Sequence, residues 1–258
     1  MKTLWLTSIP HAEDKVKDFM SRMKAYGLQV LGHFWEDNLE KMAWVGPREE
    51  ILKPEVALWA VWATAEQLKT PSIRYGLSLL AMTVQAKRGL SFPISFLLEG
   101  KEALAAESLP TPLKGADLLP SSDPAMPAKL VARVHAPVKE IPAEYRLDVY
   151  GTPQIGQWFE AGPAKDTWPG AIFGVAGAEI TFHAVGPGGS LPSQSTLDYP
   201  LKGLKLIWGE VEYTAWAARN RLDPGTSYFV QVKGSPASLL FGPYSPDAEA
   251  ELYALKLG

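Results

Sequence analysis

The sequence predicts an α/β domain built on a parallel sheet, followed by an all-β domain that forms a sandwich or a barrel. In the first hundred residues, strand patterns alternate with helical patterns, which is the order of a parallel sheet with helical crossovers. Glycine and proline then become frequent, because only six of 22 glycines and five of 22 prolines lie in residues 1–100. Since these residues mark turns, the rest of the chain should consist of short strands.

The first part of the chain carries four strand patterns and two helical patterns. The strand pattern at residues 55–63 is apolar almost throughout, as in a strand that is covered on both faces. The helical pattern at 12–26 places Val16, Phe19 and Met23 on one face. We predict strands at 2–8, 28–35, 55–63 and 92–98, and helices at 12–26 and 72–87.

The second part differs in composition and follows a proline-rich connection. Five prolines lie within residues 102–128, which indicates an extended linker. The predicted organisation is therefore an α/β domain at 1–101, a linker at 102–128 and a β-rich domain at 129–258. Residues 211–218 fit either a strand or a helical face. Strands are predicted at 129–136, 145–150, 155–160, 171–175, 179–185, 204–208, 211–218, 228–233, 238–241 and 252–257.

Composition excludes several classes of function. The apolar share of 47% and the charged share of 21% are typical of a globular protein. A net charge of −3 without a basic run argues against nucleic acid or an anionic membrane as the main partner. The absence of cysteine excludes disulfides, thiolate catalysis and cysteine-bound zinc. The N-terminal apolar run is too short for a signal-peptide core, and the longest apolar run, at 56–65, is about half as long as a membrane span, so we expect a cytoplasmic protein.

The opening strand–helix–strand order, the apolar strand at 56–62 and the Tyr75-Gly76-Leu77-Ser78 helix resemble a known group of domains. These are the TIR-like and nucleoside deoxyribosyltransferase-like domains of the flavodoxin type. The resemblance covers residues 1–100 and implies a flavodoxin-like parallel sheet. Enzymes of this group carry a glutamate on the helix that follows the strand similar to 56–62, where it stabilises positive charge on the ribose.

The chain departs from that group at the position that matters for catalysis. Residues 67–98 contain no aspartate or glutamate, and Arg74 carries the opposite charge. Cleavage through an oxocarbenium-like state needs a nearby negative charge. We therefore predict no catalytic residue and no cofactor. The alternative is that Glu36, Asp37 or Glu66 supplies the carboxylate, with NAD or a nucleotide as the ligand.

Candidate ligand-binding residues follow the predicted parallel strands. The carboxyl ends of such strands form the edge of the sheet where ligands bind. Each candidate also has a plain structural reading; the one at position 72, for example, is an ordinary helix N-cap. The candidates are Ser8, His11, His33, Trp35, Ser72 and Arg74.

Metal and phosphate motifs are missing from the sequence. The four histidines lack the helical spacing of paired metal ligands, so no metal site is predicted. The glycine-rich run at 186–190 lacks the Lys-Ser or Lys-Thr pair of a phosphate-binding loop and is interpreted as a mobile loop tip.

Tryptophans of the second part provide the remaining functional candidates: Trp158, Trp168, Trp208 and Trp216. Their rings could pack the core, stack on sugars, or anchor a protein partner. The leading hypothesis is a non-enzymatic interaction or assembly subunit of a cytoplasmic multi-protein complex. The alternatives are an N-glycosidase or transferase acting on NAD or nucleosides, and a glycan-binding β module.

Overall fold

The structure is a computed structural model that describes residues 2–244 and 251–258. By its internal contacts the chain divides into two compact units, Met1–Ile141 and Pro142–Gly258. The first is an α/β unit and the second consists of antiparallel sheets, as the sequence predicts.

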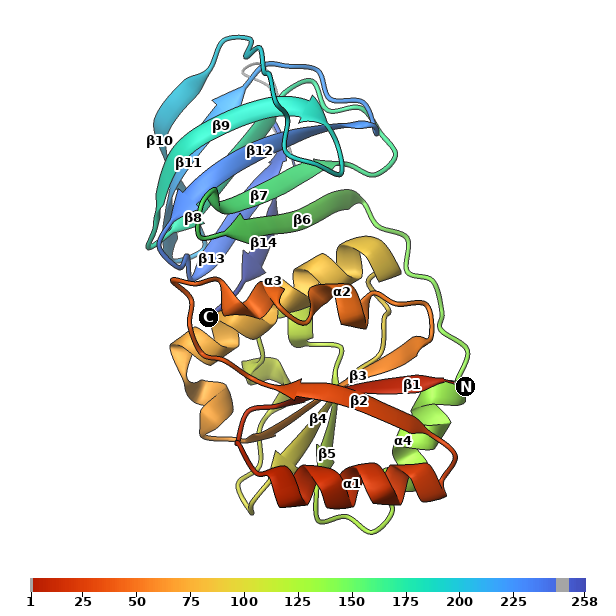
Figure 1. Ribbon diagram of the computed structural model, residues 1–258. Helices are drawn as coiled ribbons and strands as arrows, with labels where there is room; N and C mark the ends of the chain where they lie inside the picture. The colour runs from red at the N-terminus through yellow and green to blue at the C-terminus, as the bar shows by residue number, and fades with distance from the viewer. Residues whose placement is uncertain (1, 245–250) are drawn as a thin grey trace. The chain divides into compact units, whose positions relative to one another are not determined.

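The first unit is built on a parallel five-stranded sheet (Figure 1). Its strand order, β2-β1-β3-β4-β5, is one of the two common orders of doubly wound α/β sheets. All four predicted strands of this part are present, and a fifth lies beside β4. The strands are β1 (Thr3–Ser8), β2 (Gln29–Phe34), β3 (Val56–Thr64), β4 (Ile94–Glu99) and β5 (Asp117–Pro120).

Helices cover both faces of this sheet (Figure 1). The two predicted helices form as α1 (Glu13–Ala25) and α3 (Pro71–Arg88). With α4 (Met126–His135), α1 covers one face, while α3 and the short α2 (Arg48–Ile51) cover the other. The buried core beneath α1 and α4 contains Leu4, Leu6, Phe19, Met23, Leu28, Val30, Leu58, Ala60, Trp62, Leu97, Met126, Leu130 and Val134.

The region around residue 130 differs from the prediction. Residues 129–136 were predicted as a strand, and they form most of helix α4. The reason is the spacing of the buried Met126, Leu130 and Val134, which place one side chain per helical turn against the sheet. The segment 102–128, predicted as an extended linker, contains strand β5 and the start of α4.

The second unit consists of two antiparallel sheets that face each other (Figure 1). One has the order β6-β7-β12-β9 and the other β10-β11-β8-β13-β14. Aromatic pairs join them, including Phe159 with Phe173, whose ring centroids lie 5.6 Å apart. The strands are β6 (Tyr145–Thr152), β7 (Gly156–Pro163), β8 (Ala171–Ala176), β9 (Glu179–Pro187), β10 (Leu201–Trp208), β11 (Val211–Ala218), β12 (Thr226–Lys233), β13 (Ser238–Pro243) and β14 (Tyr253–Lys256). Of the two predicted arrangements, this is the sandwich.

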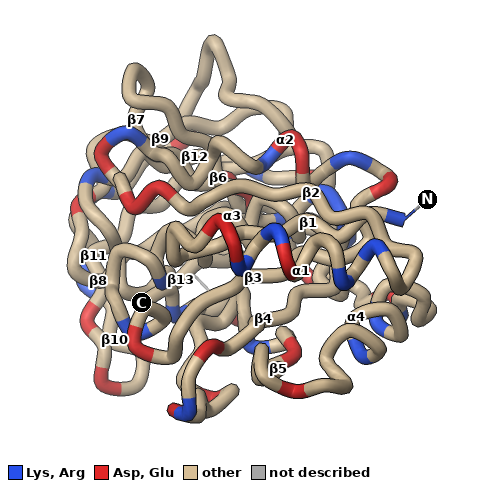
Figure 2. Tube along the Cα trace, turned by 60° about the horizontal axis from the view of Figure 1, so that its bottom comes forward, with Lys and Arg blue, Asp and Glu red and all other residues tan. Residues whose placement is uncertain are grey.

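Two further features concern the described residues. No helix among them is long and apolar enough to cross a membrane. Along the Cα trace, lysines and arginines are interspersed with aspartates and glutamates (Figure 2).

Candidate functional site

The carboxyl ends of β1, β2 and β3 lie together at one edge of the parallel sheet. The Trp35 backbone N–H donates to the Ser8 carbonyl at 2.8 Å, and the Ile9 N–H donates to the Trp62 carbonyl at 2.9 Å. These bonds continue the parallel pairing beyond the strands. They bring the predicted candidates after β1 and β2 to the edge where wound sheets bind ligands.

Three of the predicted ligand residues have local structural partners. The Ser8 hydroxyl donates to the Pro10 carbonyl at 2.7 Å. The exposed His11 ring stacks on Phe34, with centroids 4.9 Å apart. Arg74 donates from Nη2 to the Ser108 carbonyl at 2.7 Å, so its guanidinium ties α3 to a distant turn. These contacts account for all three side chains without a ligand.

The first turn of α3 receives a carboxylate from another part of the chain. The Ser72 hydroxyl donates to Asp37 Oδ2 at 2.6 Å, across 35 residues of sequence. Because α3 begins at Pro71, the N-cap is Thr70, which makes no side-chain cap bond, and the reading of Ser72 as the N-cap is wrong. A negative charge near the positive end of a helix is stabilising. Residues 67–98 lack an acid along the sequence, but Asp37 provides one in space.

The other acidic residues at this edge differ in their surroundings. Glu66 lies 3.5 Å from the Lys69 ammonium, and Glu36 is exposed. Glu99, at the end of β4, pairs with Lys15 and accepts the Trp62 indole N–H. Sequence reasoning missed Glu99. The sequence did contain a signal for it, because Glu99 directly follows the predicted strand at 92–98.

His33 is held at one ring nitrogen and has no partner at the other. The Trp5 indole N–H donates to His33 Nδ1 at 3.2 Å. Since an indole can only donate, Nδ1 is the acceptor, and the neutral ring carries its proton on Nε2. Burial lowers the pKa of His33 to about 4, so the ring is neutral at pH 7. Its buried Nε2–H finds no acceptor in the described part of the chain.

Trp35 presents a second buried donor next to His33. The indole is 5% exposed and packs on Gly76 of α3 so closely that a Cβ there would lie 2.7 Å from Trp35 Cζ2. The ring centroids of His33 and Trp35 are 6.4 Å apart. Among the described residues the Trp35 Nε1–H has no hydrogen-bond acceptor either. Each unpaired buried donor costs about 1–3 kcal/mol.

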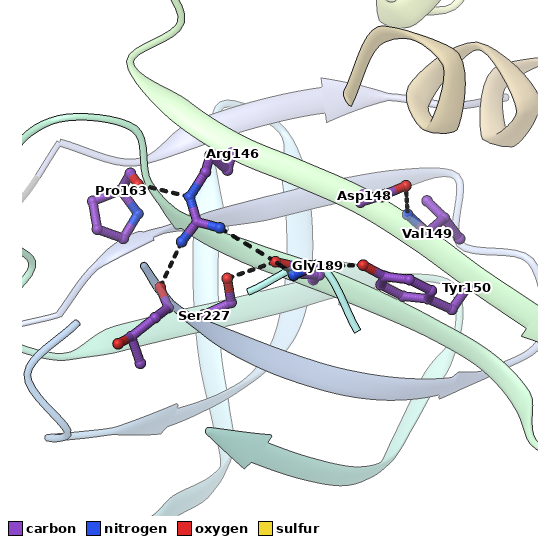
Figure 3. Close-up of polar contacts among 9 residues, drawn as sticks. Arg146, Asp148, Val149, Tyr150, Pro163, Gly189 and Ser227 are labelled. Carbon is purple, nitrogen blue, oxygen red and sulfur yellow. Dashed lines mark hydrogen bonds and ion pairs between the residues drawn. The ribbon is translucent and has the colours of Figure 1, made fainter. Parts of the chain in front are cut away.

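The four-stranded sheet of the second unit carries a buried charged cluster (Figure 3). Glu160 is 3% exposed and accepts the Ser227 hydroxyl at 2.6 Å, the Gly189 N–H at 3.0 Å and the Arg146 Nη1 at 3.4 Å. The Tyr150 hydroxyl also donates to it. The Glu160 carboxylate is thus hydrogen-bonded by its neighbours within the unit. Its bond to Gly189 holds the 186–190 loop, which was interpreted as mobile.

A histidine, a tyrosine and a tryptophan meet in the second unit. His183 Nδ1 lies 2.6 Å from the Tyr228 hydroxyl, and its ring meets Trp216 edge-on at 4.9 Å. Burial, with the positive charge of Lys202, lowers the pKa of His183 to about 4. The Lys202 ammonium lies over the Trp216 ring at 4.5 Å. Trp216 thus packs against residues of its own unit.

The other predicted tryptophans occupy three different environments. Trp168 is 5% exposed and belongs to the core. Trp158 donates its indole N–H to the Ile155 carbonyl at 2.9 Å and packs against Phe182. Trp208, at the end of β10, is 47% exposed. Of the four, it offers the most accessible ring to a partner.

Comparison with known proteins gives no family for this chain. No family model matches it, and no curated protein matches its sequence. Within residues 2–244 and 251–258, no three histidine or acidic side chains gather as a metal site.

Proposed function

We propose that the chain is a non-enzymatic interaction or assembly subunit of a cytoplasmic multi-protein complex, with a degenerate nucleotide-binding-type α/β unit. One observation carries this proposal. At the tip of the β10–β11 hairpin, Ile207 is 79% exposed, Trp208 47% and Val211 39%. Large apolar side chains exposed on the surface are typical of protein-binding sites.

The hairpin geometry supports a role in binding. Trp208 and Val211 are paired across the two strands, so their side chains lie on the same face. β10 is also an edge strand of its five-stranded sheet. An edge strand has free backbone donors and acceptors that a partner strand can pair with.

The edge of the parallel sheet is also consistent with a non-enzymatic role. Asp37 is bonded to Ser72, and Glu99 is bonded to both Lys15 and Trp62. Carboxylates that already have partners are less available to stabilise a sugar cation. The proposal therefore places the main activity on the hairpin.

The test compares proteins that co-purify with the tagged chain from its native cells. The double variant Ile207→Ser/Trp208→Ser removes two exposed apolar side chains from the hairpin. The matched control, Val138→Ser/Ile141→Ser, removes two equally apolar side chains with 52% and 54% exposure elsewhere. We expect a defined set of proteins with the wild type and the control, and its loss with the hairpin variant. An identical set with all three proteins would refute the proposal.

A second candidate function is base cleavage or transfer on NAD or a nucleoside. It is favoured by Asp37, which stands at the first turn of α3 although the helix itself has no acid. Incubation with NAD and common nucleosides, followed by chromatography, tests it. Release of free base that Asp37→Asn abolishes and Glu36→Gln preserves would support this function. No release from the wild type would exclude it.

A further inference from the structure

We propose that His33 and Trp35 form a binding site for the carbonyl oxygen of a small uncharged ligand, such as a carboxamide. The site consists of the His33 Nε2–H and the Trp35 Nε1–H. Both atoms are buried, both lack a partner in the described residues, and their rings lie 6.4 Å apart at the end of β2. It does not depend on what the β10–β11 hairpin binds.

The chemistry of the two donors decides what can occupy the site. The Trp35 indole is a donor only, and His33 must donate from Nε2 because Nδ1 accepts the Trp5 indole N–H. Two donors cannot satisfy each other. One carbonyl oxygen has two lone pairs and can accept from both.

The donors are fixed in place before any ligand arrives. Trp5 holds the His33 ring through the bond at 3.2 Å, and Trp35 packs closely against Gly76. A pre-arranged site loses little conformational entropy on binding. Trp35 also lies directly after β2, at the carboxyl edge where wound sheets bind small molecules.

The neutrality of the site selects among acceptors. Burial lowers the pKa of His33 to about 4, so this ring does not supply a positive charge at pH 7. Burying an anion without a countercharge is costly. A carboxamide should therefore bind better than a carboxylate of the same size. A donor-only cation such as methylammonium should not bind.

The test is a ¹⁵N–¹H NMR titration of the full chain at pH 7 with acetamide, acetate and methylammonium. Each of the nine tryptophans contributes one indole N–H signal, and the Trp35→Phe variant identifies that of Trp35. We expect acetamide to shift the Trp35 indole proton and the His33 ring nitrogens downfield with one saturable curve. The Trp158 indole, which already donates to the Ile155 carbonyl, should not move.

Two glycine substitutions test whether the acetamide response depends on the position of the Trp35 indole. In Gly76→Ala the new Cβ displaces the Trp35 indole, and the acetamide response of His33 should be lost. Gly115→Ala, whose Cβ meets nothing within 4 Å, should keep it. An unchanged signal of the Trp62 indole, which donates to Glu99 within the same unit, shows that both variants fold.

Three results would overturn the proposal. The first is no shift of the Trp35 indole with acetamide. The second is an equal shift with methylammonium. The third is a bound water in contact with the indole proton that acetamide does not displace, since the occupant would then be structural water only.

Discussion

The Glu160 carboxylate and the unpaired donor atoms of His33 and Trp35 are all buried, but the two groups are built in opposite ways. Glu160 accepts from Ser227, Gly189 and Arg146, so its charge is compensated within the fold. His33 and Trp35 each keep a buried N–H without an acceptor in the described chain. In our proposal the first group maintains the structure, while the two donors of the second bind an oxygen atom of a ligand.

The difference has an energetic consequence. A satisfied buried charge stabilises only as long as all of its partners remain. Unpaired donors cost about 1–3 kcal/mol each, and a ligand that pairs them removes this cost. Such a ligand would stabilise the folded chain in proportion to its affinity. Substitutions in the two regions should therefore have different effects.

The largest effect is expected for Glu160→Ala. The substitution removes the acceptor of the cluster. It leaves Arg146, whose side chain is 31% exposed, without its carboxylate. We expect the free energy of unfolding of the second unit to fall by about 3 kcal/mol. Urea unfolding followed by circular dichroism measures it. Glu210→Ala, an exposed acid at the β10–β11 turn, should change stability by less than about 0.5 kcal/mol. Equal effects would show that the cluster is not structural.

Acid should weaken both units of the chain, because each contains a histidine with a lowered pKa. The pKa of His33 and of His183 is lowered to about 4 by burial, against about 6.5 in the unfolded chain. As pH falls from 6.5 toward 4, the unfolded chain takes up protons that the folded chain does not, so stability declines. We expect a loss of up to about 3 kcal/mol per histidine. Unfolding measured at pH 7 and pH 4.5 checks this.

Two variants assign the acid effect to its source. His183→Phe should remove the acid-dependent loss of stability that arises in the second unit. The exposed His135 offers the control, since His135→Gln should leave the dependence on pH unchanged. A wild type that is equally stable at both pH values would contradict the buried, neutral state of the two rings.

A smaller loss is expected for Gly188→Ala. The added Cβ would lie 2.2 Å from Arg146 Nη1 and 2.9 Å from Ser227 Oγ. Arg146 must then shift away from Glu160, at a cost of about 1–3 kcal/mol. Gly225→Ala, in the neighbouring turn, adds a Cβ with no atom within 4 Å and serves as the control. Thermal unfolding of both variants would separate them, and identical melting temperatures would contradict the predicted clash.

The smallest expected effect is the difference in stability between two tryptophan variants of the first unit. Trp59 is fully buried and donates its indole N–H to Thr7 Oγ1 at 2.8 Å, whereas the buried indole of Trp35 donates to nothing described. Replacement by Phe removes a bond at Trp59 but an unpaired donor at Trp35. We expect Trp59→Phe to be more destabilising by about 1–2 kcal/mol in urea unfolding. The reverse order would imply that Trp35 has a partner in the folded chain.

The sequence predicts the first unit well where local patterns determine the structure. The strand predicted at 55–63 from its apolar run forms at 56–64, and the helix predicted at 72–87 from its helical spacing forms at 71–88. The helix at 126–135 was missed because apolar and β-branched residues at 129–136 also fit a strand, and its helical spacing becomes evident only from Met126 onward. The short strand at 117–120 has too few residues for a pattern and is defined by pairing with β4.

The candidate sites depend on contacts that no local pattern contains. His33 and Trp35 were predicted as edge residues because they end a strand. The unpaired Nε2–H of His33, however, depends on Trp5, which the pairing of β1 with β2 brings close. The Asp37–Ser72 bond and the Glu160 cluster join residues at least ten positions apart. Such pairs follow from topology, which a single sequence does not specify.

The central claim is that one oxygen atom can accept from both His33 and Trp35. A crystal structure of the full chain grown with acetamide tests it most directly. We predict acetamide with its carbonyl oxygen within about 3.2 Å of both His33 Nε2 and Trp35 Nε1. A structure in which acetamide is absent from this position, and both N–H groups donate to protein acceptors or to a retained water, would contradict the claim.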